Sequence, residues 1–446
     1  MSKHNEFAPG KANGLVPELR FPEFEDDGGW EEKSVGEVYD FKVTNSFSRE
    51  YLNYEKGVVK NIHYGDIHTK FNTLFDIEKE KVPYINQEVS IENIKAECYC
   101  IEGDIVFADA SEDLNDVGKS IEIINLNKEK LVSGLHTLLA RQRESKLVSG
   151  FAGYLFKSYS IRKQIQKEAQ GAKVLGISAT RISKVRISLP DALQEQQKIA
   201  SCLSSLDEVI AAHSQKLELL KDHKKGLMQN LFPQEGETLP KVRFKEFEKD
   251  GEWMERKLGE LASFSSGGTP SKGNTQFWNG DIPWISASSM HYPIIEKSEL
   301  NITQAAVDNG AKIAKKGSLL ILVRGSMLHK RIPICITTRD VAFNQDVKAL
   351  KLGNDATNIF LFYLLSSYEE TLLELVSETG IGAGKLDTEY LKKLVIHLPP
   401  LHPEQQKISS CLSALDELIS AQAERIAQLQ QHKKGLMQGL FPKIDN

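Results

Sequence analysis

The chain has 446 residues and a net charge of −5, with 40% hydrophobic and 26% charged residues, a composition typical of a globular protein of two or three domains. Its first residues, MSKHNEFAPGKANG, lack the apolar stretch of a secretion signal, no run is apolar enough to span a membrane, and five scattered cysteines argue against a disulfide framework. We therefore expect a reduced, cytoplasmic protein, and the net charge taken alone argues against a nucleic-acid binder.

After a polar tail at residues 1–14, a first domain is expected over residues 15–190. Its β-rich runs are GDIVFA (103–108) and SIEIINL (120–126), and a helix is expected over residues 153–168. The segment GAKVLGISATRISKVRISLP (171–190) predicts a loop, a helical turn and a closing strand. These features indicate a mixed α/β domain.

A long spacer helix is predicted within residues 191–233. Apolar residues recur there at alternating steps of four and three, which is the heptad pattern of a coiled coil. The seam residues are Ile199, Leu203, Leu206, Ile210, His213, Leu217 and Leu220. His213 is the polar residue of this seam, and we interpret it as setting the register of the coiled coil rather than as a ligand. At about 1.5 Å per residue the helix spans roughly 57 Å.

The second half repeats this organisation, with a domain over residues 234–397 and a spacer helix with a C-terminal tail over residues 398–446. Strands are expected at GSLLILV (317–323) and DVKALKL (346–352), and a helix over residues 358–377. The second seam consists of Ile408, Leu412, Leu415, Ile419, Gln422, Ile426 and Leu429. Gln422 interrupts it as His213 interrupts the first.

The two halves are a duplication. The segment EQQKIASCLSSLDEVIAAHSQKLELLKDHKKGLMQNLFP (195–233) recurs at 404–442 with a constant offset of 209, and residues 19–38 recur at 242–261 with an offset of 223. Between these matched ends the halves diverge strongly. Joining the chain ends would recreate the internal junction LFPQEGETLPKVRF (231–244), so the chain is pseudo-circular.

The duplication predicts an α+β protein in which two mixed α/β domains are separated by two long helices. We expect the helices to form an antiparallel coiled coil around a pseudo-two-fold axis. An ordinary oligomerisation coiled coil is the alternative, and it explains the seam but not the diverged domains placed between the repeats.

The charges are segregated along the chain. Residues 18–37 hold eight acidic and two basic side chains, whereas residues 140–186 hold eleven basic and two acidic ones. Residues 311–351 hold nine basic and two acidic ones. Two basic stretches are compatible with two phosphate-binding faces, and the alternative is that both are ordinary solvated surfaces.

Motifs of a nuclease, methyltransferase or ATPase are missing from the sequence. VGKS (117–120) resembles the end of a phosphate-binding loop, but Asp113 stands where the first glycine is required and a strand is expected to follow. Cys98 and Cys100 lack partners at metal-ligand spacing. We expect neither a catalytic residue nor a metal site in this chain.

The chain resembles the specificity subunits of type I restriction–modification enzymes. The resemblance rests on the duplicated EQQKI tract, the paired HKKGLMQ helix ends, and four motifs of the second domain, and it covers the chain from about residue 15 onward. These motifs are GGTPS (267–271), WNGDIPWIS (278–286), FNQD (343–346) and GIGAGKL (380–386).

The resemblance implies a non-catalytic subunit whose two target-recognition domains each read one half of an asymmetric, bipartite site in double-stranded DNA. It also implies that the helices set the length of unread DNA and dock two methylation subunits, which supply S-adenosylmethionine and methylate adenine N6. Two restriction subunits would add translocation and cleavage that depend on ATP and Mg. The alternatives are a coiled-coil scaffold without DNA readout and a stand-alone enzyme.

Candidate DNA contacts fall in loops of both domains. The first domain lacks a GGTPS or PWI equivalent, so its base contacts cannot be aligned with those of the second from the sequence. Its candidates are Asn61, His63, Tyr64, Gly65 and Asp66 in one loop and Lys173, Ser178 and Arg181 in the closing loop. The candidates of the second domain are Ser286, Ser288, Arg324, Asn344, Gln345, Gly380 and Lys385.

The chemistry of these side chains motivates the choice. Asn, Gln and Arg can bind base edges bidentately, whereas Lys and Ser more often hold phosphates. Each candidate has a structural alternative: His63 and Tyr64 pack, Asp66 caps a turn, Asn344 and Gln345 satisfy buried backbone groups, and Gly380 shapes a loop.

Overall fold

The computed structural model describes residues 14–144, 146–234, 236–380 and 382–444, so nearly all of the polar tail predicted at 1–14 lies outside the described residues. The chain divides into two compact units. Unit 1 combines the residues up to Ser214 with those from Glu424 onward, and unit 2 consists of Gln215–Ala423. Each unit therefore contains one α/β domain, the first part of one long helix and the last part of the other.

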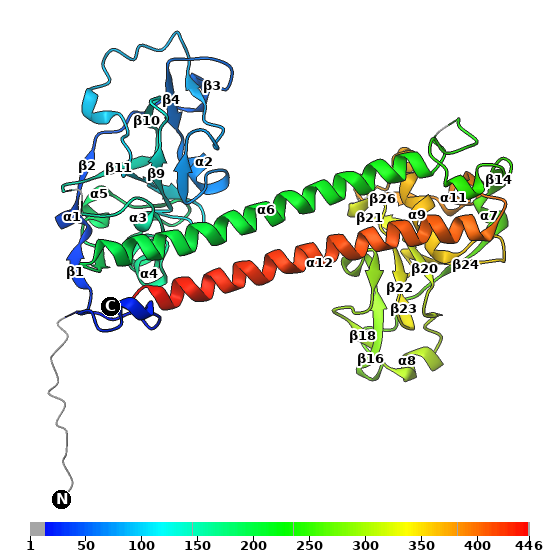
Figure 1. Cartoon of the computed structure of the whole chain (residues 1–446). Coiled ribbons are helices and arrows are strands. Elements are labelled where there is room, and N and C mark those ends of the chain that lie inside the picture. Colours follow the sequence, from blue (N-terminus) through cyan, green and yellow to red (C-terminus); the bar gives the residue numbers. More distant parts are fainter. Residues whose placement is uncertain (1–13, 145, 235, 381, 445–446) are drawn as a thin grey trace, which may run out of the picture. The chain divides into compact units, whose positions relative to one another are not determined.

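The domain of unit 1 contains a five-stranded and a four-stranded sheet (Figure 1). The first has the order β2 (Tyr39–Lys42), β11 (Thr137–Gln142), β7 (Ile105–Ala108), β9 (Ser120–Asn125) and β5 (Leu74–Asp76). The second has the order β10 (Lys130–Ser133), β4 (Val59–Ile62), β6 (Tyr84–Ile85) and β3 (Leu52–Asn53). Two further pairs join β1 (Glu31–Ser34) to β13 (Arg186–Leu189) and β8 (Ala110–Ser111) to β12 (Leu175–Gly176).

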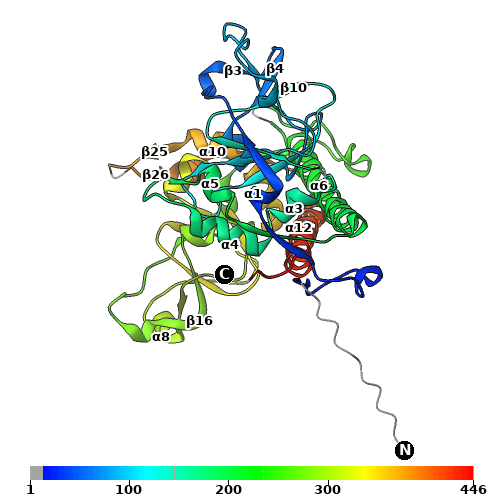
Figure 2. The ribbon, with the colours of Figure 1, turned by 90° about the vertical axis from the view of Figure 1, so that its left-hand side faces the viewer.

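Short helices cover these sheets: α1 (Val35–Val38), α2 (Tyr64–Thr69), α3 (Phe151–Leu155), α4 (Tyr159–Glu168) and α5 (Ala179–Ile182). The single helix predicted over residues 153–168 is wrong, because the backbone of Ser158 is extended, with φ −60° and ψ 150°, and separates α3 from α4. In Figure 2, where unit 1 faces the viewer, α3 lies against the long helices. Its Phe151 and Ala152 share a buried core with residues of both.

The domain of unit 2 repeats the five-stranded sheet. Its order is β15 (Ala262–Ser266), β24 (Val347–Leu352), β20 (Leu319–Leu322), β22 (Ile334–Thr337) and β17 (Ile294–Ile295). The four-stranded sheet runs β18 (Asn301–Ile302), β16 (Trp278–Ile285), β23 (Val341–Phe343) and β19 (Ile313–Ala314). A three-stranded sheet contains β21 (Arg324–Gly325), β26 (Gly384–Leu386) and β25 (Val376–Glu378), and β14 (Met254–Lys257) pairs with β27 (Val395–Leu398).

The helices of this domain are α7 (Leu258–Leu261), α8 (Gln304–Asp308), α9 (Asn358–Ser367), α10 (Glu369–Glu374) and α11 (Thr388–Lys393). The helix predicted over residues 358–377 is also broken, since α10 starts after Tyr368 and the chain then enters β25. Edge pairing of β25 with β26 satisfies backbone groups that a longer helix would have used.

The two long helices are α6 (Leu193–Leu231) and α12 (His402–Leu440). In unit 1 the start of α6, with Ile199 and Leu203, packs with Leu440 near the end of α12. In unit 2 the roles are exchanged, and Ile408 and Leu412 pack with Leu231. Each unit thus confirms the antiparallel pairing, and all fourteen seam residues are buried or half-buried.

The entry of the chain into each domain is equivalent. The backbone N–H of Leu19 donates to Gly439 O at 2.8 Å, and that of Val242 donates to Asn230 O at 2.9 Å. The segment that precedes the first domain therefore binds the end of α12 as the internal junction binds the end of α6. This contact confirms the pseudo-circular organisation.

A buried clamp fixes each entry segment to the start of its long helix. Glu195 accepts two hydrogen bonds from Arg20, both at 2.8 Å, and one from Trp30 Nε1 at 3.2 Å. The clamp of unit 2 consists of Glu404, Arg243 at 2.7 Å and Trp253 at 3.3 Å. Because both carboxylates are buried, these charge-assisted bonds hold the start of each domain in place.

A second duplicated contact joins each domain to both helices. The Asp207 carboxylate accepts hydrogen bonds from Tyr154 at 2.8 Å and from Lys433 at 2.5 Å. In unit 2, Asp416 is bound by Tyr363 at 2.8 Å and Lys224 at 2.6 Å. Each triad takes its lysine from one long helix, its aspartate from the other and its tyrosine from the domain.

Candidate nucleic-acid interface

The single loop predicted around residues 61–66 is wrong, because Asn61 lies in β4 and Tyr64, Gly65 and Asp66 lie in the short helix α2, which a buried carboxylate holds in place. Asp66 accepts two hydrogen bonds from Arg49 at 2.8 and 2.9 Å and pairs with Lys70 at 2.8 Å. Burial raises the pKa of Asp66, but the bonds from Arg49 and Lys70 outweigh burial and lower that pKa below its ordinary value. Asp66 therefore anchors α2 rather than facing solvent.

Aromatic and imidazole rings gather around Tyr64. The ring of His63 lies 4.7 Å from it, that of His136 5.3 Å and that of His68 6.0 Å, centroid to centroid. His63 also caps α2, because its Nδ1 accepts the Gly65 N–H at 3.1 Å. Burial, followed by the charge of Arg49, lowers the pKa of His63, so this imidazole is neutral at physiological pH.

The closing loop of the first domain borders a hollow of about 590 Å³. Ser178 caps α5, and Arg181 Nη1 donates to the backbone and side-chain oxygens of Glu168 at 3.0 and 3.1 Å. Both residues line the hollow, together with Asp109 and His136. His136 thus links the two predicted loops, since it also contacts Tyr64, and nothing in the sequence around it signals this role.

The other candidates of the first domain lie in different environments. Asn61 is fully buried and accepts a hydrogen bond from Asn45 Nδ2 at 2.8 Å. This burial, like that of Asp66, favours the structural alternative, because an interior side chain cannot meet a base edge. Gly65 is half-buried and Lys173 is exposed.

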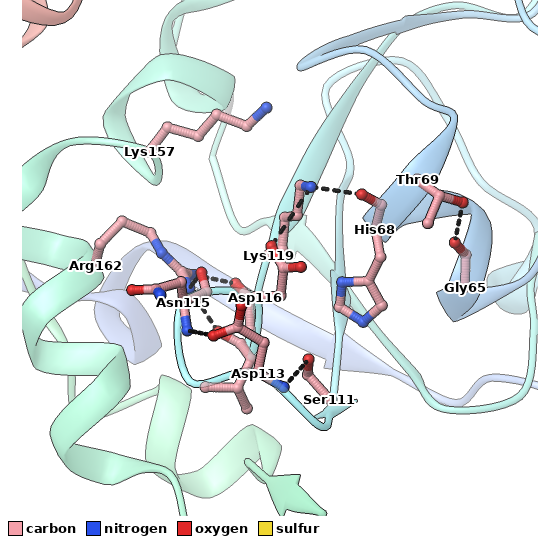
Figure 3. Close-up of polar contacts among 12 residues, drawn as sticks. Gly65, His68, Thr69, Ser111, Asp113, Asn115, Asp116, Lys119, Lys157 and Arg162 are labelled. Atoms are coloured by element: carbon pink, nitrogen blue, oxygen red, sulfur yellow. Dashed lines mark hydrogen bonds and ion pairs between the residues drawn. The ribbon is translucent and has the colours of Figure 1, made fainter. Parts of the chain in front are cut away.

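The loop that contains VGKS does not have the geometry of a phosphate-binding loop (Figure 3). Three of its backbone oxygens accept hydrogen bonds from Arg162 at 2.7–2.9 Å, so the loop presents carbonyl groups to a cation. Lys119 Nζ is engaged with the backbone oxygen of His68 at 2.6 Å and lies 3.6 Å from Asp116. The loop ties α2, which follows His63, to the rest of the domain.

In the second domain the motifs that are far apart in sequence meet. Trp284 Nε1 donates to Gly268 O at 3.0 Å, and Thr269 Oγ1 donates to Gln345 Oε1 at 2.8 Å. Strands β16 and β23 pair in parallel with Ile285 opposite Phe343. GGTPS, WNGDIPWIS and FNQD therefore form one site, with Gln345 exposed on it.

Arg324 and the last motif adjoin this site. The Val323 N–H donates to Asp346 O at 2.8 Å, which places Arg324 beside the FNQD turn. Arg324 is exposed and is the register partner of Lys385, whose Nζ lies 3.1 Å from Asp387. Gly380 is exposed in the preceding loop, next to position 381, which lies outside the described residues.

The remaining candidates bond to their own loops. Ser286 Oγ and Ser288 Oγ lie 3.0 Å apart. Asn344 is buried, its Oδ1 accepts the Asp346 N–H at 3.1 Å, and its amide donates to the Asp346 carboxylate at 3.2 Å. The structure thus favours the alternative for Asn344, that it shapes the turn. Lys348, which the sequence did not single out, binds Ser266 Oγ, and burial lowers its pKa.

Backbone hydrogen bonds align the two candidate surfaces, which the sequence could not do. The bond from Gly134 N to Ile62 O (2.8 Å) in the first domain matches that from Asn344 N to Ile285 O (2.9 Å) in the second. The bond from Asp109 N to His136 O (3.0 Å) likewise matches that from Val323 N to Asp346 O (2.8 Å). The bond from Ile177 N to Asp109 O (2.8 Å) matches that from Leu386 N to Val323 O (2.9 Å). His63 therefore corresponds to Ser286, and Ala110 to Arg324. The predicted loops of both domains occupy the same place in the fold.

Within the described residues, three or more His, Cys, Asp or Glu side chains nowhere gather in a way that could hold a metal ion. Likewise, none of the helices in the described ranges is both long and apolar enough to cross a membrane.

Comparisons with known proteins agree on one family. A family model described as "Type I restriction modification DNA specificity domain" matches residues 27–222 and 250–431. The specificity subunit of the Escherichia coli type I restriction enzyme EcoR124I/EcoR124II is 33% identical over 178 residues, which is 40% of this chain and 44% of that protein. The putative specificity subunit MjaX of Methanocaldococcus jannaschii is 28% identical over 382 residues, 83% of this chain and 84% of that protein.

Solved structures share the fold. The type I restriction–modification S subunit of M. genitalium superimposes with a TM-score of 0.58 at 15% identity, covering 97% of this chain and all of that one. A chain from a structural study of type I restriction–modification assembly and conformational transition gives a TM-score of 0.57 at 17% identity, covering 93% and 98%.

Proposed function

The chain belongs to the type I restriction–modification DNA specificity family, and from this premise we propose that it reads DNA sequence for a multi-subunit enzyme. Each α/β domain reads one half of an asymmetric, bipartite target in double-stranded DNA. The subunit itself catalyses no reaction and selects the DNA sequence at which its partner subunits act.

The observation that carries this proposal is the contrast between an equivalent backbone and different surface chemistry. At corresponding positions the first domain has the half-buried Ala110 where the second has the exposed Arg324. Base edges in the major groove differ in their donor and acceptor pattern, so unlike side chains at one place on the same framework favour unlike sequences. Two copies of such a domain fit a target with two different halves.

The long helices support the finer part of the proposal. Each has 39 residues, which at about 1.5 Å per residue corresponds to roughly 58 Å. We propose that this length sets the unread spacer between the half-sites. Because the two units repeat one framework, we propose two equivalent places for methylation subunits, which bring S-adenosylmethionine and methylate adenine N6. Two restriction subunits, with ATP and Mg, then cleave unmodified DNA.

The test is to co-express the chain with its methylation subunit and to map N6-methyladenine across a genome by long-read sequencing. We expect one asymmetric bipartite motif that disappears when this chain is omitted. Methylation that is absent, or unchanged without the chain, would overturn the proposal in favour of a coiled-coil scaffold without DNA readout.

Two variants sharpen this test. Exchange of residues 42–188 for another recognition domain should change only one half of the motif, and a change in both halves would contradict separate reading. Insertion of one helical turn into both α6 and α12 should lengthen the spacer and leave both half-sites unchanged. An unchanged spacer would contradict the role of the helices as a ruler.

A further inference from the structure

We propose that His136 and Asp109 are specificity-determining residues of the first domain, and that the hollow beside them receives the edge of a base with an exocyclic amino group, adenine or cytosine. The inference rests on the proposed function, because it assigns a base contact to a surface that is proposed to read DNA. Neither residue belongs to the two loops that the sequence singled out.

His136 and Asp109 are bonded to each other through both side chains and backbone. His136 Nδ1 lies 3.1 Å from Asp109 Oδ1, and the Asp109 N–H donates to His136 O at 3.0 Å. Two bonds of different kinds therefore hold these residues together. The His136 side chain is nevertheless 50% exposed and that of Asp109 28% exposed, so both remain open to a ligand.

The backbone of His136 has a positive φ. The value is +55°, a left-handed conformation that histidine adopts more often than most residues other than glycine. The turn between β10 and β11 is fixed by its bonds to Asp109 and by the ring of Tyr64, so the imidazole ring is held at a set position.

The pair of His136 and Asp109 lies between the segment that contains Tyr64 and the closing loop of the domain. Asp109 O accepts the Ile177 N–H at 2.8 Å, which bonds the closing loop directly to Asp109. His136 contacts Tyr64 on the other side. Both line the hollow that Ser178 and Arg181 border. A base edge that entered this hollow would lie against the pair.

The pair offers hydrogen-bond acceptors to a ligand. A carboxylate accepts hydrogen bonds and donates none, so Nδ1 of His136 carries the proton of this bond, and Nε2 is an acceptor whenever the ring holds a single proton. The second Asp109 oxygen is an acceptor as well. The major-groove donors of DNA are the amino groups of adenine and cytosine. A carboxylate repels phosphate, so a contact through Asp109 favours a base edge over the DNA backbone.

The second domain has different side chains at the corresponding positions. The backbone alignment places Val323 where the first domain has Asp109, followed by Arg324 where the first has Ala110. The second domain thus has an apolar valine where the first has the anionic acceptor Asp109, and at the next position an exposed guanidinium where the first has an alanine. The same hydrogen bonds place Asp346 where the first domain has His136. Arginine is suited to guanine, so the two domains are suited to different bases in this part of the fold.

The experiment uses the full chain with its methylation subunit and compares the wild type with His136→Asn and Asp109→Asn. Asparagine adopts the left-handed conformation more readily than most residues, so H136N removes the ring without straining the turn. The matched control is Lys128→Asn, an exposed left-handed residue of the turn between β9 and β10, φ +62°, which does not line the hollow. Methylation rates are measured on the mapped site and on every single-base variant of it.

We expect H136N and D109N each to reduce discrimination about 10- to 100-fold at the same base pair of the first half-site. Discrimination in the second half, the spacer and the thermal unfolding temperature should match K128N. Unchanged discrimination in H136N and D109N, or a uniform loss on all sequences, would overturn this inference while the proposed function stands. A wild-type complex without any sequence preference would overturn both.

Discussion

In unit 1, Trp30 and Arg20 bind the carboxylate of Glu195, and in unit 2 Trp253 and Arg243 bind that of Glu404 with distances that agree within about 0.1 Å. The Tyr–Asp–Lys triads repeat as closely. The candidate DNA surfaces lie on the same backbone framework, but the side chains at their corresponding positions differ. The contacts that fix each domain to the helices are therefore separate from the contacts proposed to read sequence.

This separation explains how one framework can carry two unlike surfaces. The residues that the two units share are buried or half-buried and lie where the domain meets the helices, whereas His136 or Arg324 does not contact them. A framework of this kind tolerates replacement of a reading surface, because the exchanged residues do not contribute to the clamps. Three measurements test whether the two frameworks are energetically equivalent.

The largest effect is expected at the buried clamps. Glu195→Ala and Glu404→Ala each remove the carboxylate that binds a buried arginine and an indole N–H, and each should destabilise its own unit by about 3–5 kcal/mol. Hydrogen exchange followed by mass spectrometry, combined with denaturant unfolding, assigns the loss to one unit. Equal losses would establish that the clamps are equivalent.

The control for this measurement is an exposed pair on the same segments. Glu23→Ala removes the partner of Lys198, and Glu246→Ala removes that of Lys407, and exposed pairs of this kind contribute little. If Glu195→Ala were no more damaging than Glu23→Ala, the clamp would not hold the entry segment.

The next effect distinguishes the units by pH. Glu122 lies opposite Ile105, and the corresponding position opposite Leu319 is Ile336, so only unit 1 has a buried carboxyl there. Burial raises the pKa of Glu122 to about 7, although hydrogen bonds from Gly150 N and Gly153 N oppose the shift. The folded carboxyl holds its proton more tightly than the unfolded one.

Proton linkage gives the direction in which the stability of unit 1 changes with pH. The contribution of Glu122 is present below its unfolded pKa and is lost as pH rises through about 7, so unit 1 should lose at most about 3 kcal/mol between pH 5 and 8. Glu122→Gln should flatten this slope in unit 1, and unit 2 serves as the control within the same molecule. Equal pH slopes in the wild-type and variant forms of unit 1 would contradict the assignment.

The smallest effect is expected at the triads. Tyr154→Phe and Tyr363→Phe each remove one hydroxyl that binds a helix aspartate, and each should cost about 1 kcal/mol. Chemical denaturation monitored separately in the two units measures the change. A marked difference between the two variants would show that the triads, although alike in geometry, are not alike in energy.

The sequence predicted the framework because its signal is local. The heptad seam and the ungapped repeat lie in contiguous segments, so the long helices were predicted from spacing and their antiparallel pairing from the duplication. The strands at residues 103–108 and 317–323 carried the same kind of local pattern and are confirmed as β7 and β20. The broken helices were missed because a single non-helical residue, Ser158 in the first domain and Tyr368 in the second, leaves no compositional mark.

The candidate surface was only partly predictable, because it depends on contacts between distant segments. Asn61 has the side chain of a base reader, yet it lies inside the domain bonded to Asn45. His136 has no motif around it and comes into the surface through Asp109 and Tyr64. DNA contact by the individual candidates remains a prediction.

The division of unit 1 along the chain has a consequence for synthesis on the ribosome. Unit 2 is a continuous segment, Gln215–Ala423, and can complete its core as soon as that segment has emerged. Unit 1 is made first but needs Leu440 and Phe441, which pack with Trp30 and Phe151. The contacts between the start of α6 and the end of α12 are therefore missing while all of unit 2 is translated, so the half that is synthesised first is the half that finishes folding last.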